Sequence, residues 1–221
     1  MRLLTSYRGP MAQMSMNKVI HGAVRRDLDR FVGALSGFPA GDQKRANELA
    51  TAWDNYDVQL TNHHEGEHEI AWPALESVGV TSELLTTLDG EHEAMAAAMG
   101  ETRAAIAALK RSASAENAEA ALNAVTNLRT VTVRHLDHEE AEIEPIYLDK
   151  VDTPELQAMG KKFSRASGPK EAGAFFAWLL DGASDAEEQM IRGSIPGPVL
   201  AILTGLFGRK YKRDVAPVWG A

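Results

Sequence analysis

Histidine and glutamate residues recur at matched distances in the two halves of this 221-residue chain. The first half has His21 followed by His63 and Glu67, and the second half has His92 followed by His135 and Glu139. The lone histidine precedes the paired histidine by 42 residues in the first half and by 43 in the second. A proline follows each paired histidine by ten residues, at Pro73 and at Pro145. The matched spacing indicates an internal repeat of one chemical unit.

The residue types and the four-residue step suit metal binding. Helical side chains four residues apart are rotated by only about 40°, so a histidine and its glutamate reach the same interior space. The lone histidine of the preceding helix then adds a ligand from the opposite wall. Four imidazoles and two carboxylates suit a dinuclear iron centre, although ligand type alone leaves zinc and manganese open. The predicted metal ligands are His21, His63, Glu67, His92, His135 and Glu139.

The repeat is what favours a metal site over simpler explanations. A single buried histidine is more often a hydrogen-bonded core residue than a ligand. An isolated His-x-x-x-Glu pair is commonly an exposed side-chain contact. Exposed pairs have no reason to recur with a lone histidine at the same distance upstream. We therefore expect two equivalent His-His-Glu half-sites.

Four long helices are expected to position these ligands. The predicted segments are residues 16–35, 42–72, 81–111 and 115–144. Apolar residues at steps of three and four give each segment one inner face. Asp42 is the expected N-cap of the second helix, Pro73 is expected to interrupt that helix, and Pro145 is expected to end the fourth. Long helices joined by short loops predict an all-α fold, an antiparallel up-down four-helix bundle.

The chain is expected to divide into three parts. The division is an N-terminal extension at residues 1–15, the bundle at residues 16–148 and a helical C-terminal appendage at residues 149–221. Met11, Met14 and Met16 are alternative translation starts, and the site does not depend on which is used. The appendage carries only short apolar segments, such as 174–180 and 199–207, so we expect short helices that pack on the bundle.

The H…HxxxE…H…HxxxE arrangement resembles the hemerythrin-like, or HHE cation-binding, family. The resemblance extends over residues 16–148 and includes the stretch Glu67-His68-Glu69-Ile70-Ala71-Trp72-Pro73. It implies a four-helix bundle with a non-haem di-iron site joined by an oxo or hydroxo group. Family members bind dioxygen, sense oxygen or redox state, handle nitric oxide or peroxide, or repair iron centres. Oxygen carriers of the family have a further histidine at the position of Ala96, so one iron here is expected to be more open.

Other histidines near the motif break its repeat. His64 and His68 are rotated by about 100° from the ligand pair, and we expect them to be exposed or to lie behind the ligands. His138 lies nearer the ligand face and stays open as a replacement for the missing imidazole. Tyr56 lies seven residues before His63, and core packing is a simpler explanation for it than a hydrogen bond at the metal.

The acidic residues near the second motif allow two interpretations. Asp137 is a candidate for orienting a ligand histidine. The run formed by Glu140, Glu142 and Glu144 is interpreted as a solvated helix face.

Composition narrows the remaining classes of function. The formal net charge of −8 argues against a general nucleic-acid binder. Cysteine is absent, so thiolate sites and disulfides are excluded. No apolar run approaches the roughly 18 residues of a membrane span, and the first ten residues do not read as a signal peptide, so we expect a cytoplasmic protein. The basic cluster at 209–213 reads as a solvated helix end, with an acidic partner or anionic lipid as the alternative.

The leading functional hypothesis is a di-iron protein that binds or reduces dioxygen, peroxide or nitric oxide. Whether it turns over as an enzyme is left open by the sequence. The alternative is a metal-dependent oxygen or redox sensor in which residues 151–221 carry the signal to a protein partner. A third reading, iron storage, is disfavoured because further carboxylates do not line the expected bundle.

Overall fold

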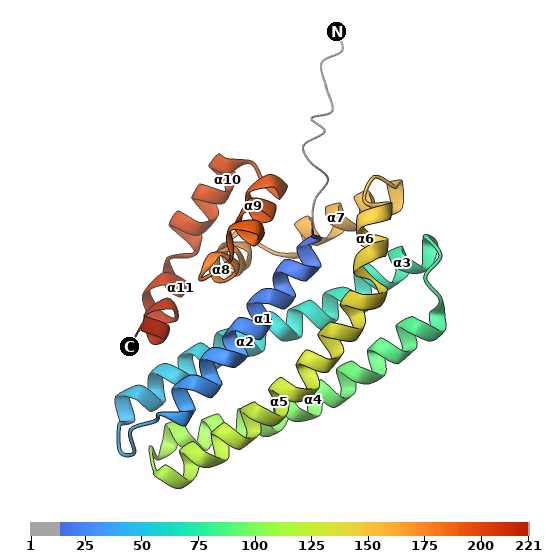
Figure 1. Cartoon of the computed structure of the whole chain (residues 1–221). Helices are drawn as coiled ribbons and strands as arrows, with labels where there is room; N and C mark the ends of the chain where they lie inside the picture. Colours follow the sequence, from blue (N-terminus) through green and yellow to red (C-terminus); the bar gives the residue numbers. More distant parts are fainter. Residues whose placement is uncertain (1–13, 221) are drawn as a thin grey trace.

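The computed structural model describes residues 14–220 of the chain. Every regular element in that range is a helix, which confirms the predicted all-α class (Figure 1). Most of the predicted extension 1–15, with the alternative start Met11, lies outside the described residues. Ser15 caps the first helix, because its side chain accepts a hydrogen bond from the backbone N–H of Lys18.

Four long helices form the body of the molecule. They are α1 (Met16–Ser36), α2 (Gln43–Gly66), α4 (Ser82–Arg111) and α5 (Ala115–Glu142). Figure 1 shows them side by side and joined by short connections. Asp42 is the N-cap of α2, as predicted, and Thr81 is the N-cap of α4, since their side chains accept backbone N–H bonds three residues on. Of the neighbouring pairs, α4 and α5 pack most extensively, whereas α1 and α2 touch little.

The two prolines stand at changes in the helical backbone. A π-helical turn, η1 (Glu67–Ala71), follows α2 and leads into α3 (Trp72–Ser77), so the predicted interruption lies at the π-helical turn just before Pro73, which stands in the first turn of α3. The N–H of Trp72 bonds to the carbonyl of Glu67, five residues back, and this wider turn accommodates a residue that has no N–H and would clash in an α-turn. Pro145 does stand at a break, because α5 ends at Glu142 and α6 (Glu144–Lys150) follows directly.

Two apolar cores fill the interior. The main core includes Leu28, Phe31, Leu49, Trp53, Leu60, Met95, Leu128 and Leu136. The second core includes Ala71, Trp72, Leu75, Leu88, Ile143, Tyr147 and Leu156. In α2, α4 and α5 the predicted ligands fall between a residue of one core and a residue of the other, such as Leu88 and Met95 around His92. The predicted ligands therefore form a polar layer between two apolar regions.

The appendage consists of short helices. They are α7 (Pro154–Ala166), α8 (Pro169–Leu180), α9 (Asp185–Ser194), α10 (Gly197–Ile202), the π-helical turn η2 (Leu203–Phe207), α11 (Arg209–Asp214) and the 3-10 turn η3 (Ala216–Gly220). Gly173 on α8 and Gly208 after η2 allow these two segments to approach closely, since a Cβ at either position would collide with backbone atoms of the other segment.

The appendage docks on α1 through a buried polar contact. The carboxylate of Asp27, 1% exposed, accepts a hydrogen bond of 2.7 Å from Nε1 of Trp178 on α8. Arg30 bridges Asp27 and Asp181, at 3.1 and 3.2 Å. Trp178 and its apolar neighbours belong to the main core, so α1 and the appendage share one interior.

Within residues 14–220, no single helix has the length and apolar character needed to cross a membrane. Segments 185–194 and 197–207 satisfy that composition only when taken together, and they are bent by 109° at the break between them.

Candidate metal centre

The six predicted ligands converge between the two cores, and His64 joins them. Their ligand atoms lie within 4.8 Å of one another in two overlapping groups. The buried metal group consists of His21, His63, Glu67 and Glu139, and the outer metal group consists of His64, Glu67, His92 and His135. Every member of the buried metal group is buried, whereas His64 and His92 are half-buried. Glu67 belongs to both groups.

Each carboxylate lies between imidazoles of both groups. The oxygen-to-Nε2 distances are 3.1 Å for Glu67–His63, 3.4 Å for Glu67–His92, 3.2 Å for Glu139–His21 and 3.6 Å for Glu139–His135. Glu67 uses a different oxygen for each histidine, whereas Glu139 presents the same oxygen, Oε2, to both. Both side chains are therefore placed to connect two neighbouring cations.

Several of these buried atoms have no hydrogen-bond partner among the described residues. They are Nε2 of His63 and His64, both carboxylate oxygens of Glu67, and Oε2 of Glu139. The atoms are close to one another but are not aligned as donor and acceptor. Burying polar atoms without partners is unfavourable by roughly 1–3 kcal/mol each. Cations in the centre of the cluster would satisfy all of them at once.

The arrangement of the outer imidazoles also fits a metal. Nε2 of His92 lies 3.0 Å from Nε2 of His135. Two nitrogens that each lie about 2.1 Å from one ion, at right angles, are about 3.0 Å apart. His92 is held in place by stacking against His64, with ring centroids 4.1 Å apart, and against Trp72, at 6.1 Å. The residues present therefore fit a pair of metal ions with nitrogen and oxygen ligands.

Burial keeps four of the imidazoles neutral. It lowers the pKa of His63 and of His64 well below the ordinary 6.5, and the neighbouring histidines lower it further. Burial and the nearby His135 lower the pKa of His92 to about 4. The pKa of His135 is also lowered by burial, which outweighs Glu91 and Glu139. Neutral imidazoles bind a metal without first losing a proton.

The two carboxylates have opposite protonation tendencies. Burial raises the pKa of Glu67 well above its ordinary value, and the charge of Glu139 raises it further. Burial also acts to raise the pKa of Glu139, but His21 and His135 outweigh it and hold that pKa at about 2. The pKa of His21 is raised, because Glu139 and Glu140 outweigh its burial. Without a metal, proton binding at Glu67 is therefore favoured, and a cation would compete with that proton.

Carboxylates behind the imidazoles fix their orientation. Nδ1 of His21 lies 3.1 Å from Oε1 of Glu140, and Nδ1 of His135 lies 2.9 Å from Oε2 of Glu91. The other oxygen of Glu91 lies 2.9 Å from Nδ1 of His138. Such partners fix the ring tautomer and make the opposite nitrogen a better ligand. They direct Nε2 of both ligand histidines into the cluster.

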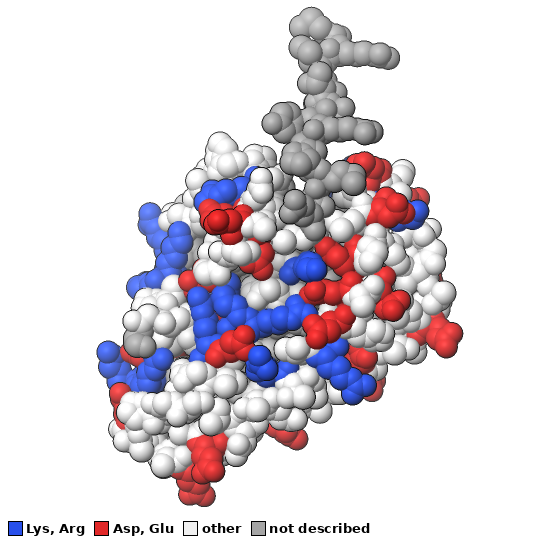
Figure 2. Space-filling view, in the orientation of Figure 1, with Lys and Arg blue, Asp and Glu red and all other residues white. Residues whose placement is uncertain are grey.

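Polar residues of α1 reinforce the buried side. Asn17 donates a hydrogen bond of 2.8 Å to Oε1 of Glu139. Arg25 pairs with both Glu140 and Asp137 across the α1–α5 contact. Figure 2 shows basic and acidic side chains interleaved on this face of the molecule. The ion pairs hold α1 against α5 outside the buried metal group.

His64 corrects the sequence prediction. It was expected to be exposed or to lie behind the ligands, yet it is half-buried and one of its ring nitrogens lies in the outer metal group. Consecutive residues of α2 face two different neighbours: the ring of His63 contacts His21 on α1 at 5.2 Å, and that of His64 stacks on His92 of α4. The 100° rotation between them therefore points each toward a different part of the cluster.

Neither Ala96 nor His138 supplies the imidazole that oxygen carriers of the family have at the position of Ala96. Ala96 is exposed on α4. His138 was the candidate replacement, but its Nδ1 bonds to Glu91 and its side chain is 34% exposed. His64 is the additional imidazole beside the outer metal group.

The remaining predictions near the site divide between confirmation and correction. His68 is exposed, as expected. Tyr56 is buried and its ring packs against Trp53 at 5.4 Å, so core packing explains it. Asp137 is exposed and pairs with Arg25 instead of orienting a ligand.

The acidic run after the second motif is not a uniformly solvated face. Glu140 is only 17% exposed on its side chain, and its contacts with His21 and Arg25 hold its pKa at about 2, although burial acts to raise it. Glu144 is buried and accepts a hydrogen bond of 2.7 Å from the backbone N–H of Ser15. Glu142 is exposed, as expected. The run was misread because Glu140 and Glu144, four residues apart, share the face that packs on the start of α1.

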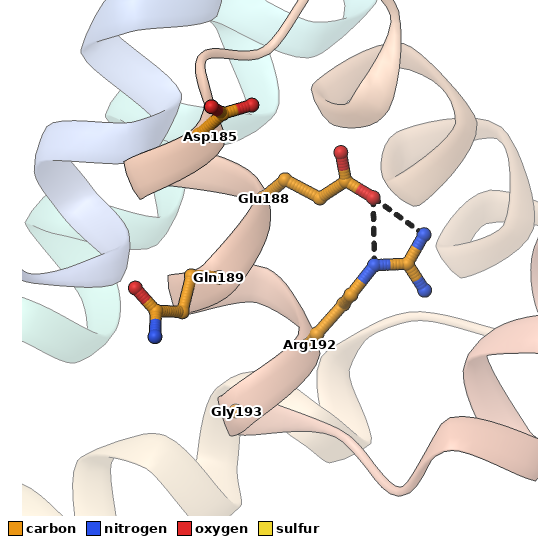
Figure 3. Close-up of a pocket in the computed structure, with 5 residues that line it drawn as sticks. All are labelled: Asp185, Glu188, Gln189, Arg192 and Gly193. Carbon is orange, nitrogen blue, oxygen red and sulfur yellow. Dashed lines mark hydrogen bonds and ion pairs between the residues drawn. The ribbon is translucent and has the colours of Figure 1, made fainter.

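A shallow depression elsewhere offers no comparable chemistry. It lies along α9, and Figure 3 shows the five residues that line it. Its two facing charges, Glu188 and Arg192, form an ion pair with each other. The depression therefore presents a surface whose main charges are already neutralised.

Comparison with protein families agrees with this geometry. The family model described as the hemerythrin HHE cation binding domain matches residues 17–147. The match covers more than half of the chain, so the chain belongs to this family, and the resemblance seen in the sequence is confirmed. Comparisons with curated proteins and with solved structures gave no match. The family and the His/Glu cluster together support cation binding.

Proposed function

We propose that this chain is a non-haem di-iron protein that binds or reduces dioxygen, peroxide or nitric oxide. The observation that carries the proposal is the convergence of unpartnered buried atoms of His63, His64, Glu67 and Glu139 among imidazoles. Hydrogen bonding within residues 14–220 leaves these atoms unsatisfied, and two cations would satisfy them. Membership of the HHE family favours iron over zinc or manganese.

In this proposal the seven residues have distinct roles. His21 and His63 hold the ion of the buried metal group, and His64, His92 and His135 hold the ion of the outer metal group. Glu67 would hold both ions, since it belongs to both groups, and Glu139 would hold the ion of the buried metal group, with its Oε2 3.2 Å from His21 and 3.6 Å from His135. Glu140 and Glu91 keep His21 and His135 oriented. When bound, the iron pair supplies the electrons and an open coordination position.

The difference in exposure favours the outer metal group as the side where a small ligand enters. His21 and Glu139 are fully buried, while the side chain of His92 is 11% exposed and Glu91 behind His135 is 23% exposed. Apolar cores flank the cluster on two sides. Dioxygen, nitric oxide and hydrogen peroxide, of two to four atoms, are small enough to enter beside these partly exposed side chains.

We also propose the corresponding domain division. Residues 16–148 form an antiparallel up-down bundle that carries the metal site, and residues 149–221 form the appendage. The placement of all seven candidate ligands on α1, α2, η1, α4 and α5 supports this division.

A sensor function is the second candidate, favoured by one observation. Helix α1 carries His21 and, six residues later, Asp27, which binds Trp178 of the appendage. A change of metal occupancy or oxidation state at His21 could therefore shift α1 and, through the Asp27–Trp178 hydrogen bond, move α8. If the protein is a sensor, amide hydrogen exchange in α8 will differ between its oxidised and reduced forms. Equal exchange in both forms would rule out the sensor function, and ligand binding would be the only function proposed.

The direct test of the leading function is reaction after anaerobic loading with ferrous iron. Peroxide, dioxygen and nitric oxide are added separately, and the near-ultraviolet spectrum and peroxide consumption are followed. The proposal expects a spectral change with at least one of them, lost in His63→Ala and His135→Ala and retained in His68→Ala. An iron-loaded protein whose spectrum responds to none of the three would contradict the proposal.

A further inference from the structure

Glu67 and Glu139, the two carboxylates of the cluster, are held in different ways. Glu139 accepts a hydrogen bond of 2.8 Å from the side chain of Asn17. Among residues 14–220, neither carboxylate oxygen of Glu67 has a hydrogen-bond partner. The direction of the Glu67 carboxylate therefore depends on the backbone that carries it.

The backbone at Glu67 is the start of the π-helical turn η1. The N–H of Trp72 bonds to the carbonyl of Glu67, five residues back, so this turn is wider than an α-helical one. The oxygens of Glu67 lie 3.1 Å from Nε2 of His63 and 3.4 Å from Nε2 of His92, in both metal groups. A small rotation of the turn would change both distances. Contacts that fix η1 therefore also fix the position of the shared carboxylate.

Helix α7 of the appendage packs against this turn. Leu156 of α7 is 6% exposed and belongs to the second core together with Trp72. Phe163, further along α7, lies against Gly66, where a Cβ would be only 2.8 Å from the phenyl ring. Glycine lets the ring lie this close to the backbone immediately before Glu67. Helix α7 therefore contacts the chain just before η1 and shares a core with the residue just after it.

The appendage also bridges a weak contact of the bundle. Helices α1 and α2 touch little, and residues of both line a cavity of about 1730 Å³ together with residues of α7 and α8. On α1, Asp27 accepts the hydrogen bond from Trp178 of α8, and the carboxylate of Glu187 from α9 lies against Gly22, the residue after His21. The appendage is thus fixed to α1 and reaches η1 through α7.

We propose that Phe163 is a positioning residue of the metal site. Its ring rests on Gly66 and holds the start of η1, so that the Glu67 carboxylate points between the imidazoles of the two metal groups. Phe163 acts only through Gly66 and Glu67. The inference rests on the proposed function and extends it, because it makes the appendage a necessary part of the metal site.

The first test is amide hydrogen exchange in the metal-free, full-length protein. Phe163 is 39% exposed, so Phe163→Ala removes the contact with Gly66 while taking little from the core. Exchange at residues 67–72 is expected to become about tenfold faster, and exchange in α5 and α8 to stay unchanged. Val199→Ala on α10, at a site 46% exposed, is the matched control and should alter neither. Faster exchange throughout the chain, or no change at 67–72, would overturn the inference.

The second test is the affinity for iron, measured by competition with a chelator. Because Glu67 belongs to both groups, Phe163→Ala is expected to weaken binding of both ions by about tenfold, within the range typical of residues that support a ligand. The Mössbauer spectra of both irons should change as well. Phe163→Leu keeps an apolar contact on Gly66 and should retain both affinities within about threefold. Equal affinities and spectra in the wild type and Phe163→Ala would overturn the inference.

The two measurements distinguish failure of the inference from failure of the proposed function. If the wild-type protein binds no iron, the proposed function fails, while exchange in the metal-free protein still decides whether Phe163 holds η1. If the wild type binds two irons and Phe163→Ala behaves identically in both measurements, the metal function stands and the inference fails.

The sharpest test is a double-mutant cycle across the contact. The three heavy atoms nearest to a Cβ at Gly66 all belong to the Phe163 ring, so Gly66→Ala should displace the ring and weaken both ions by about tenfold. In Gly66→Ala/Phe163→Ala the added methyl group meets no ring, and the loss should be no greater than in Phe163→Ala alone. Gly100→Ala on α4, where a Cβ would meet nothing within 4 Å, is the control and should keep both affinities. Losses that add fully in the double variant would overturn the inference.

Discussion

The two metal groups differ although the sequence repeat that supplies them is nearly symmetric. The buried metal group combines two imidazoles with two carboxylates, all of them buried, while the outer metal group combines three imidazoles with one carboxylate, and two of its imidazoles are half-buried. Equal spacing along the chain therefore determines which residues come together. It does not determine how these residues divide between the two metal groups.

Local backbone and neighbouring side chains break the symmetry. Glu67 begins a π-helical turn, whereas Glu139 lies within the regular helix α5. Glu139 also receives a hydrogen bond from Asn17, and the first repeat contributes a second imidazole, His64. Each feature lies outside the repeated motif. The repeat alone suggested two equivalent half-sites, but these features make them different.

The largest effect is expected at the shared carboxylate. Glu67→Ala removes a ligand from both groups, so bound iron should fall from about two per chain to less than about 0.2. Metal analysis after reconstitution and desalting measures this. Glu65→Ala, at an exposed position two residues earlier, is the control and should keep the full amount. If Glu67→Ala keeps one tightly bound iron, the residue is not shared.

Removal of one imidazole is expected to affect one ion. His63→Ala should empty the buried metal group and His92→Ala the outer metal group, each leaving about one iron per chain. Mössbauer spectra of the remaining iron should differ between the two variants, because one environment has two carboxylates and the other has three imidazoles. Indistinguishable residual iron in the two variants would refute the inequivalence.

His64 provides a sharper test of the outer metal group. His64→Ala should weaken binding of the ion in the outer metal group by at least about 100-fold, which is the largest effect typical of residues that only support a ligand. Binding of the ion in the buried metal group should not change. His68→Ala is the matched control, since that side chain is 69% exposed. Competition with a chelator gives both affinities. If the two variants bind both ions with equal affinity, His64 is not a ligand.

The smallest effect is expected at the orienting carboxylates. Glu140→Gln should weaken the buried ion, and Glu91→Gln the outer ion, each by about tenfold. The reason is that each carboxylate fixes one ligand ring through Nδ1. Glu142→Gln, at an exposed position, should leave both ions unchanged. A loss of the wrong ion in either variant would show that the groups are partitioned differently.

The sequence predicted the parts of this site that depend on periodicity. The convergence of the six candidate ligands follows from spacing along a helix, and the helix cap at Asp42 follows from its residue type. The convergence of these ligands could be predicted because helical geometry fixes their directions.

The features that were missed depend on contacts between helices. His64 reaches the cluster only because α2 lies between α1 and α4, and Glu140 is buried only because α1 covers it. A π-helical turn before Pro73 accommodates the proline between α2 and α3. Spacing rules do not predict this turn. A usable signal for His64 was present in the sequence: the first repeat carries two consecutive histidines where the second carries His135 and Leu136.

The central claim is that two ions lie in one cluster of His and Glu residues. The most direct measurement is the iron content of the full-length protein after anaerobic reconstitution, combined with its absorption and Mössbauer spectra after oxidation. We expect about two irons per chain, in two distinct environments, with charge-transfer bands in the near ultraviolet. A colourless protein that retains no iron after reconstitution in excess ferrous salt would contradict the claim.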